Sequence, residues 1–259
     1  MSDNKQTVLF EVCVDSFESC VEAIKGGAGR LELCSSLFLG GLTPSYGMMK
    51  VIKDKLPHTV PIHVLIRPRA GDFLYNDIEM EIMERDILIA KELGYEGVVI
   101  GILLSDGSID VTRTKQLASL ASPMSVTFHR AFDMCNDYKK GFNDLLSIDC
   151  IDRILTSGLE SSVLEGIDVI KDLIEMSNNT RIKILPGGGI NERNLAKIIK
   201  KTKTNEIHTS GRVTQDSAMT FRNNRAFMGG ELRASEYTLS IVNHKKIETF
   251  RNISSHVNN

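Results

Sequence analysis

The stretch Phe10-Glu11-Val12-Cys13-Val14-Asp15 alternates between apolar residues and polar or sulfur-bearing residues, and this alternation decides the fold. Side chains of a β-strand point alternately to opposite faces, so the apolar residues share one face and the others share the second. The same alternation recurs in Leu31-Glu32-Leu33-Cys34 and in Ile62-His63-Val64-Leu65-Ile66-Arg67. If helices cover the apolar faces, the polar faces need a different enclosed space, and the lumen of a closed parallel barrel supplies one.

Strand-like segments recur along the whole chain and alternate with segments of helical spacing. Strands are expected at residues 8–14, 30–34, 61–67, 97–102, 125–130, 153–156, 181–185 and 206–209. Eight strands spaced by about 25–35 residues indicate a parallel α/β architecture. A doubly wound open sheet is the alternative, but its central strands would read as continuous apolar runs. We therefore predict the α/β class and a single-domain (β/α)8 TIM barrel over residues 8–230. Residues 231–259 are expected to form a short C-terminal extension outside the repeat, with a hairpin and a partly disordered end.

Length and composition agree with this fold and exclude several functions. The chain has 259 residues, and such barrels usually need about 250. A net charge of −2 argues against a nucleic-acid partner, which normally requires a strongly basic surface. No apolar run approaches the roughly 18 residues of a membrane span. The five scattered cysteines do not form a secreted disulfide framework, so we expect a cytoplasmic protein that could also enter the nucleus.

Acidic and basic residues gather on the expected lumen face of the strands. In TIM barrels the loops that follow the strands build the active site at one end of the barrel. Two neighbouring carboxylates on this face are costly unless cations or a shared proton relieve them. The candidate catalytic residues are Glu11, Glu32, His63, Arg67 and His129. The alternative is that the same residues form a buried ion network that only holds the lumen together.

Glycine-rich loops follow the last three strands. Glycine lets backbone N–H groups approach an anion closely, and arginine side chains suit carboxylate or phosphate ligands. The candidate anion- or phosphate-binding residues are Arg69, Arg130, Ser157, Gly158, Gly187, Gly188, Gly189, Ser210 and Gly211. Turns need glycine in any case, so a purely structural role is the alternative. The chain lacks a GxGxxG motif after its first strand and lacks a phosphate-binding P-loop, so no nucleotide cofactor is expected.

Two cysteines occupy equivalent positions, because Cys13 and Cys34 each follow a lumen-facing glutamate by two residues. Adjacent strands lie about 4.8 Å apart, so at matched depth the two sulfurs could share one ligand. Soft thiolates select Cu(I) or Zn. The alternative is that both cysteines simply fill buried space, as most free cysteines do.

Several longer motifs resemble the CutC copper homeostasis family, in particular its animal-type members. The motifs are Glu11-Val12-Cys13-Val14-Asp15-Ser16, Leu31-Glu32-Leu33-Cys34-Ser35, Gly40-Gly41-Leu42-Thr43-Pro44-Ser45, Arg67-Pro68-Arg69, Thr127-Phe128-His129-Arg130-Ala131-Phe132-Asp133, Leu155-Thr156-Ser157-Gly158 and Leu185-Pro186-Gly187-Gly188-Gly189-Ile190. The resemblance implies a cytosolic, oligomeric TIM barrel, a dimer or a tetramer, that binds or traffics copper. It also implies that Cys13 and Cys34 are Cu(I) ligands.

The chain departs from the family pattern at three places. Gly29 and Ala70 replace residues that the family usually has, and Thr209-Ser210-Gly211-Arg212 differs from the usual run. None of these departures removes a lumen charge or a cysteine. Two functions stay open at this point. One is a copper homeostasis protein that binds Cu(I), and the other is an enzyme acting on a small phosphorylated or carboxylated metabolite.

Overall fold

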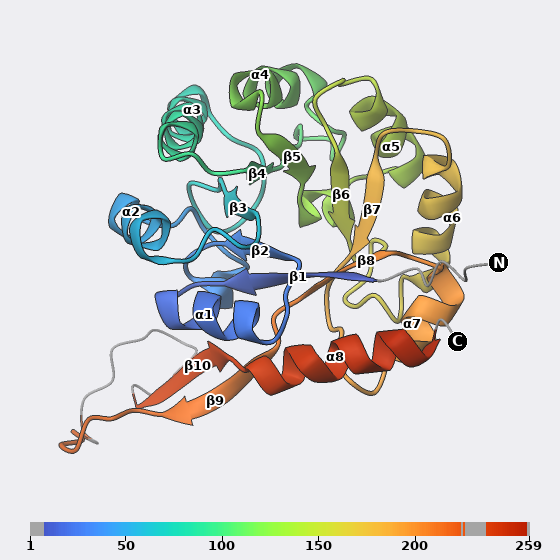
Figure 1. Cartoon of the computed structure of the whole chain (residues 1–259). Helices are drawn as coiled ribbons and strands as arrows, with labels where there is room; N and C mark the ends of the chain where they lie inside the picture. Colours follow the sequence, from blue (N-terminus) through green and yellow to red (C-terminus); the bar gives the residue numbers. More distant parts are fainter. Residues whose placement is uncertain (1–7, 224, 226–236, 258–259) are drawn as a thin grey trace.

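The computed structural model describes residues 8–223, 225 and 237–257, and in these residues eight parallel strands form a barrel (Figure 1). The strands are β1 (Leu9–Val14), β2 (Arg30–Leu33), β3 (Ile62–Leu65), β4 (Gly97–Ile100), β5 (Ser125–Phe128), β6 (Arg153–Thr156), β7 (Lys183–Pro186) and β8 (Glu206–Thr209). They pair in the order β7-β6-β5-β4-β3-β2-β1-β8. A parallel bridge between Gly187 and His208 joins the two ends of this sheet. The TIM-barrel prediction is confirmed.

Helices form the outer layer of the barrel, and polar side chains mark where most of them begin. They are α1 (Phe17–Lys25), α2 (Tyr46–Lys55), α3 (Asp77–Glu92), α4 (Val111–Ala121), α5 (Tyr138–Leu146), α6 (Ile167–Ser177), α7 (Leu195–Thr202) and α8 (His244–Val257). Ser16, Ser45 and Asn76 each accept a hydrogen bond from a backbone N–H in the first turn, as N-cap residues do. No helix in the described part of the chain is long and apolar enough to cross a bilayer.

The hydrophobic core lies between the strands and the helices. Val12, Leu31 and Val64 are completely buried there, each on the parity that the alternating pattern assigns to the helix-facing side. Residues of the opposite parity, among them Glu11, fill the lumen instead. The amino-acid alternation therefore separates an apolar shell from a polar interior, as the sequence predicts.

The register between β1 and β2 differs from the one expected. Glu11 pairs with Arg30 and Cys13 pairs with Glu32, so Cys34 lies one lumen layer beyond Cys13. The prediction of matched depth for the two cysteines is therefore wrong. The physical reason is that a closed barrel staggers its strands along the sheet, and local sequence does not reveal this offset.

Two glycines on the lumen side of the sheet create space for imidazole rings. A Cβ atom at position 97 would overlap the His63 ring, and one at position 101 would overlap the His129 ring. Because the glycines at positions 97 and 101 lack side chains, His63 and His129 from the neighbouring strands can enter the lumen.

The last helix of the chain belongs to the barrel wall, and an antiparallel pair of strands precedes it. Strand β9 (Arg212–Asp216) pairs antiparallel with β10 (Thr238–Val242), and α8 then packs between α1 and α7. Phe250 of α8 is buried and stacks on Phe10 of β1, with 6.2 Å between ring centroids. This helix fills the place of the eighth barrel helix, which the sequence pattern after strand 206–209 does not reveal. The predicted boundary at 230/231 and the predicted disorder at the chain end lie outside the described residues.

Candidate functional site

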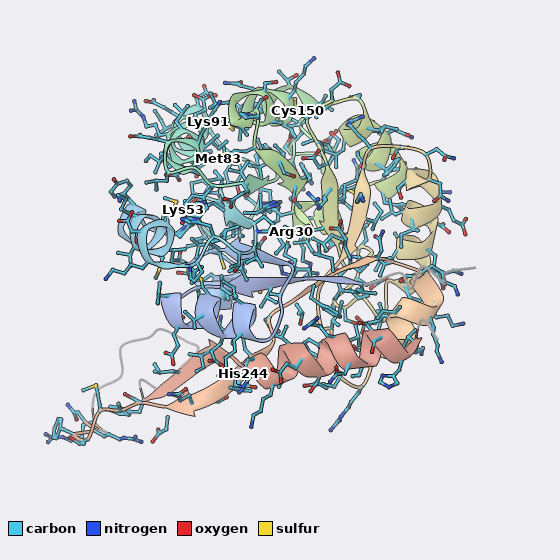
Figure 2. The ribbon with its side chains drawn as sticks, in the orientation of Figure 1. Arg30, Lys53, Met83, Lys91, Cys150 and His244 are labelled. Carbon is cyan, nitrogen blue, oxygen red and sulfur yellow. The ribbon has the colours of Figure 1, made fainter. Side chains whose placement is uncertain are left out.

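An alternating chain of charges crosses the lower lumen. The Arg30 guanidinium lies inside the barrel (Figure 2) and binds the carboxylates of Glu11 and Glu206, the latter at 2.7 Å. Arg153 binds the same Glu206 oxygen at 3.0 Å and the Ser125 hydroxyl at 2.8 Å. Each buried charge therefore has an opposite charge beside it, which is the condition under which a lumen can hold ions.

His208 of β8 connects this network to the upper lumen. Its Nδ1 lies 2.7 Å from a Glu11 oxygen, and its Nε2 lies 3.9 Å from a Glu32 oxygen. Burial alone would lower the pKa of His208, but the neighbouring Glu32, Cys13 and Glu11 outweigh burial and raise this pKa well above 6.5. These neighbours therefore favour the protonated form of His208.

The two lumen glutamates have opposite protonation tendencies. Burial would raise the pKa of Glu11, but Arg30 and His208 outweigh it and hold this pKa well below 4.5. No arginine of the described residues forms an ion pair with Glu32, and burial raises its pKa to about 7. These environments therefore favour the carboxylate form of Glu11 and the protonated form of Glu32.

Cys13, Glu32 and His208 form a cluster of possible metal ligands. One ligand atom from each lies within 4.8 Å of the other two. Cys34 is not in this group. Its thiol is completely buried and donates to the Val14 carbonyl at 3.4 Å, and burial raises its pKa above the usual range. It packs with Leu65 and Val99 in a small apolar cluster.

A cavity of about 280 Å³ opens above the cluster, at the end of the barrel where the loops follow the strands. Eight residues proposed from the sequence line it: Cys13, Glu32, Arg67, His129, Arg130, Gly188, Gly189 and Ser210. Glu11 lies beneath it in the charge network. The other predicted residues are outside the lining, namely Cys34, His63, Arg69, Ser157, Gly158, Gly187 and Gly211.

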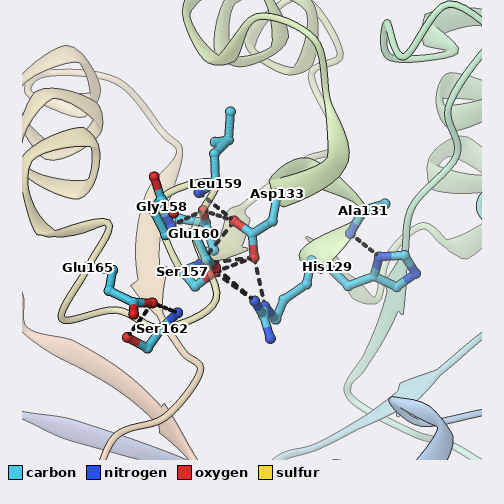
Figure 3. Close-up of polar contacts among 11 residues, drawn as sticks. His129, Ala131, Asp133, Ser157, Gly158, Leu159, Glu160, Ser162 and Glu165 are labelled. Carbon is cyan, nitrogen blue, oxygen red and sulfur yellow. Dashed lines mark hydrogen bonds and ion pairs between the residues drawn. The ribbon is translucent and has the colours of Figure 1, made fainter.

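Arg67 and His129 form one wall of the cavity. Carbonyl oxygens of Leu39, Gly41 and Gly71 accept hydrogen bonds from the Arg67 guanidinium, at 3.0, 3.0 and 2.8 Å. His129 is buried, and its Nδ1 accepts a hydrogen bond from the Ala131 N–H at 3.1 Å (Figure 3). Burial and the nearby Arg67 lower the pKa of His129 to about 3, so the ring is neutral and its proton is on Nε2. That Nε2 has no hydrogen-bond partner among the described residues.

The glycine-containing loop after β6 already binds a carboxylate of the protein, that of Asp133. The Asp133 carboxylate accepts hydrogen bonds from the Ser157 N–H at 3.0 Å and the Leu159 N–H at 3.2 Å (Figure 3). The Gly158 N–H donates to the Thr156 hydroxyl at 2.9 Å. The backbone donors of this loop are therefore not free for an external anion, contrary to the expectation for Ser157 and Gly158.

Three further predicted residues have structural partners away from the cavity. Arg69 pairs with Asp72 and Glu79 in its own loop and helix. A Cβ atom at Gly211 would overlap Ile247 of α8, so this glycine serves helix packing. His63 is buried beside Gly97, and burial lowers its pKa to about 4, so it is a neutral lumen residue.

Sequence reasoning missed His208, Arg30 and Glu206. A signal was available, because Glu206 and His208 alternate with Ile207 in the last predicted strand, as the polar residues of the first strands do. Their proximity to Glu11 follows from the pairing of β8 with β1, which closes the barrel. The sequence of a single segment does not reveal which strands pair.

The chain matches a family model, named relatives and a solved structure over most of its length. Residues 8–213 match the model of the CutC family. The "copper homeostasis protein cutC homolog" of Dictyostelium discoideum is 56% identical, with 97% of this chain and 99% of the relative covered. The human protein of the same name is 47% identical, with 96% and 90% covered. The crystal structure of CutC from Streptococcus agalactiae superimposes with a TM-score of 0.73 at 38% identity, with 78% of this chain and 97% of that chain covered.

Proposed function

This chain belongs to the CutC family, and we propose that it acts in copper homeostasis by binding Cu(I) at the Cys13 end of the cavity. Relatives at 56% and 47% identity carry the name copper homeostasis protein, which supports the general role. The observation that carries the specific proposal is the convergence of a thiol, an imidazole and a carboxyl group within 4.8 Å.

The donor atoms fit a soft metal ion. Thiolate sulfur and imidazole nitrogen are ligands that copper accepts readily. Metal-binding histidines commonly donate their other ring N–H to a carboxylate, and the Nδ1 of His208 does so to Glu11. This leaves Nε2 of His208 for the metal, beside Cys13, whose side chain lines the cavity. Glu32 adds a nearby negative charge that offsets the charge of the cation.

Cys34 remains the predicted second thiolate of this proposal. Its thiol donates to the Val14 carbonyl, so it must release that hydrogen bond before it can bind a metal as a thiolate. We therefore expect Cys13 to contribute more to copper affinity than Cys34. The same proposal includes a cytoplasmic location. It also includes a dimeric or tetrameric assembly, which light scattering after gel filtration would test.

The test is a titration of the reduced protein with Cu(I) against a competing chelator. Wild type should bind one Cu(I) tightly, Cys13→Ser and His208→Gln should each lose affinity, and Cys34→Ser should lose less. The matched control is Cys150→Ser, because Cys150 is only partly buried and lies at the opposite end of the barrel, in another pocket. Equal, weak binding by wild type and Cys13→Ser would overturn the proposal.

A second candidate function is catalysis on a small phosphorylated or carboxylated metabolite. One observation favours it: the buried Nε2–H of His129, a residue that lines the cavity, has no hydrogen-bond partner within the described part of the chain. Copper binding at Cys13 does not require this group. Buried donors without a partner are costly, so they often mark a place where a ligand supplies the acceptor. A screen of phosphorylated and carboxylated metabolites for turnover, with His129→Ala as the inactive reference, tests this candidate.

A further inference from the structure

We propose that the cavity contains a subsite for a phosphate group, formed by the backbone amides of Gly189, Ile190 and Ser210 together with the Arg130 side chain. This inference deepens the second candidate function by naming its ligand class. It does not depend on copper binding, because it uses a different set of donors.

The proposal rests on backbone N–H groups that have no hydrogen-bond acceptor among the described residues. Among the described residues, no hydrogen bond uses the N–H groups of Gly189, Ile190 and Ser210 as donors, and all three residues line the cavity. The loop after β6 provides the contrast, because the Asp133 carboxylate satisfies its amides. The structure thus has two amide-rich loops side by side, one filled by a carboxylate of the protein and one open to the cavity.

The position of the open loop fits this chemistry. The loops after the seventh and eighth strands are the usual phosphate-binding region of TIM barrels. Gly188 has φ of +121° and Gly189 has φ of +70°, values that glycine adopts without strain. A phosphate oxygen can accept hydrogen bonds from several N–H groups at once. Successive backbone amides in such loops provide these donors.

Arg130 adds a side-chain donor to the same loop. Its Nε binds Asp133 at 2.7 Å and its Nη2 binds the Ser157 hydroxyl at 2.6 Å, so the guanidinium is held in one orientation. Its Nη1 contacts no acceptor among the described residues. A Cβ atom at Gly188 would lie 3.3 Å from this Nη1, so the free donor lies directly against the open amide loop.

The charge of the cavity favours an anion. Asp133 compensates Arg130, but no ion pair of the described residues includes Arg67, which only carbonyl oxygens hold. The uncompensated Arg67 and the N–H of His129 lie on the cavity wall as well. A volume of about 280 Å³ is at the lower end of ligand pockets, so the phosphate belongs to a small metabolite.

The test follows amide resonances of the metal-free full chain during titration with inorganic phosphate and with glycerol phosphate. We expect saturable shifts of the Gly189, Ile190 and Ser210 amides, and no saturable shift of the Ser157 and Leu159 amides. Tighter binding of the ester assigns the subsite to a phosphorylated metabolite, and exclusion of the ester assigns it to phosphate itself. Absence of saturable shifts at these three amides with either probe would overturn the inference.

A variant series provides the second measurement. Arg130→Gln should weaken phosphate binding about tenfold, because it removes a charge-assisted donor. Arg85→Gln is the matched control, because Arg85 makes an exposed ion pair with Glu81 on α3. Equal affinities of the two variants would contradict the role of Arg130. Since copper titration has a separate readout, failure of the phosphate test leaves the copper proposal intact, and the reverse also holds.

Discussion

Nδ1 of His208 on β8 donates a hydrogen bond to the Glu11 carboxylate on β1, across the pair of strands that closes the barrel, at 2.7 Å. Glu11 in turn binds Arg30 on the other neighbouring strand. One buried carboxylate therefore fixes a lumen arginine and orients the imidazole whose other nitrogen lies beside Cys13 and Glu32. The stability of the lumen and the geometry of the proposed copper site depend on the same residue.

Replacement of this carboxylate should strongly destabilise the fold. Glu11→Gln leaves Arg30 and His208 without the negative charge that compensates them, and breaking a buried ion pair costs about 3–5 kcal/mol. We expect a loss of this size in the free energy of unfolding, measured by chemical denaturation at pH 7. The control is Glu81→Gln, which removes a carboxylate from an exposed pair with Arg85 and should cost less than about 1 kcal/mol. Similar losses in both variants would show that the lumen network contributes little.

Glu32 should make the stability of the metal-free protein decrease with rising pH. Its pKa is about 7 in the folded state and near 4.5 in the unfolded chain, so its neutral form favours folding fully below pH 4.5. This contribution is lost as the pH rises through 7. Relative to wild type, Glu32→Gln should therefore gain stability between pH 5 and pH 8, by up to about 3 kcal/mol.

Denaturation of both proteins at pH 5, 6, 7 and 8 with a copper chelator present checks this expectation. The sign is opposite for Glu11, whose lowered pKa gives stability that is present above pH 4.5 and is lost at lower pH. A wild-type minus variant difference that does not change with pH would show that Glu32 titrates at its ordinary pKa.

The lumen glycine at position 97 should not tolerate a methyl group. A Cβ atom there would overlap the His63 ring, and overpacking of a filled core costs about 1–3 kcal/mol. Gly47→Ala is the matched control, because Gly47 lies in α2 and its nearest neighbouring atom would be 4.0 Å from the new Cβ. This control should stabilise the protein by up to about 1 kcal/mol, since alanine favours helices. Thermal unfolding of Gly97→Ala and Gly47→Ala should therefore shift in opposite directions.

The fold was predictable from the sequence because its decisive signal is local. The alternation in residues 10–15 assigns Glu11 and Cys13 to the lumen without any knowledge of neighbouring strands, and the structure agrees. The depth of Cys34 was not predictable in this way. Depth depends on the stagger between β1 and β2, which the closure of the whole barrel determines.

The candidate site was predictable only in part for the same reason. Cys13, Glu32 and His129 follow from strand parity, whereas the selection of His208 requires knowledge that β8 pairs with β1. The loop after β6 shows a second limit. Its glycine pattern resembles an anion site, but Asp133 from the preceding loop occupies it, and only tertiary structure reveals that competitor.

Copper binding should become stronger as the pH rises, and His208 should account for part of this dependence. The pKa of His208 lies well above 6.5, so in the metal-free protein Nε2 carries a proton that must leave before this nitrogen can bind a metal. Each displaced proton changes the affinity about tenfold per pH unit while its donor is protonated. We therefore expect the Cu(I) affinity of wild type to increase between pH 6 and pH 8, in a chelator competition at constant ionic strength.

His208→Gln cannot release this proton, so its affinity should be lower at pH 8 and its dependence on pH should be weaker by about one proton. The two proteins should consequently differ most at high pH and least at pH 6. Parallel pH profiles would show that copper binds without His208, and the metal site would then have to be sought at the two cysteines alone.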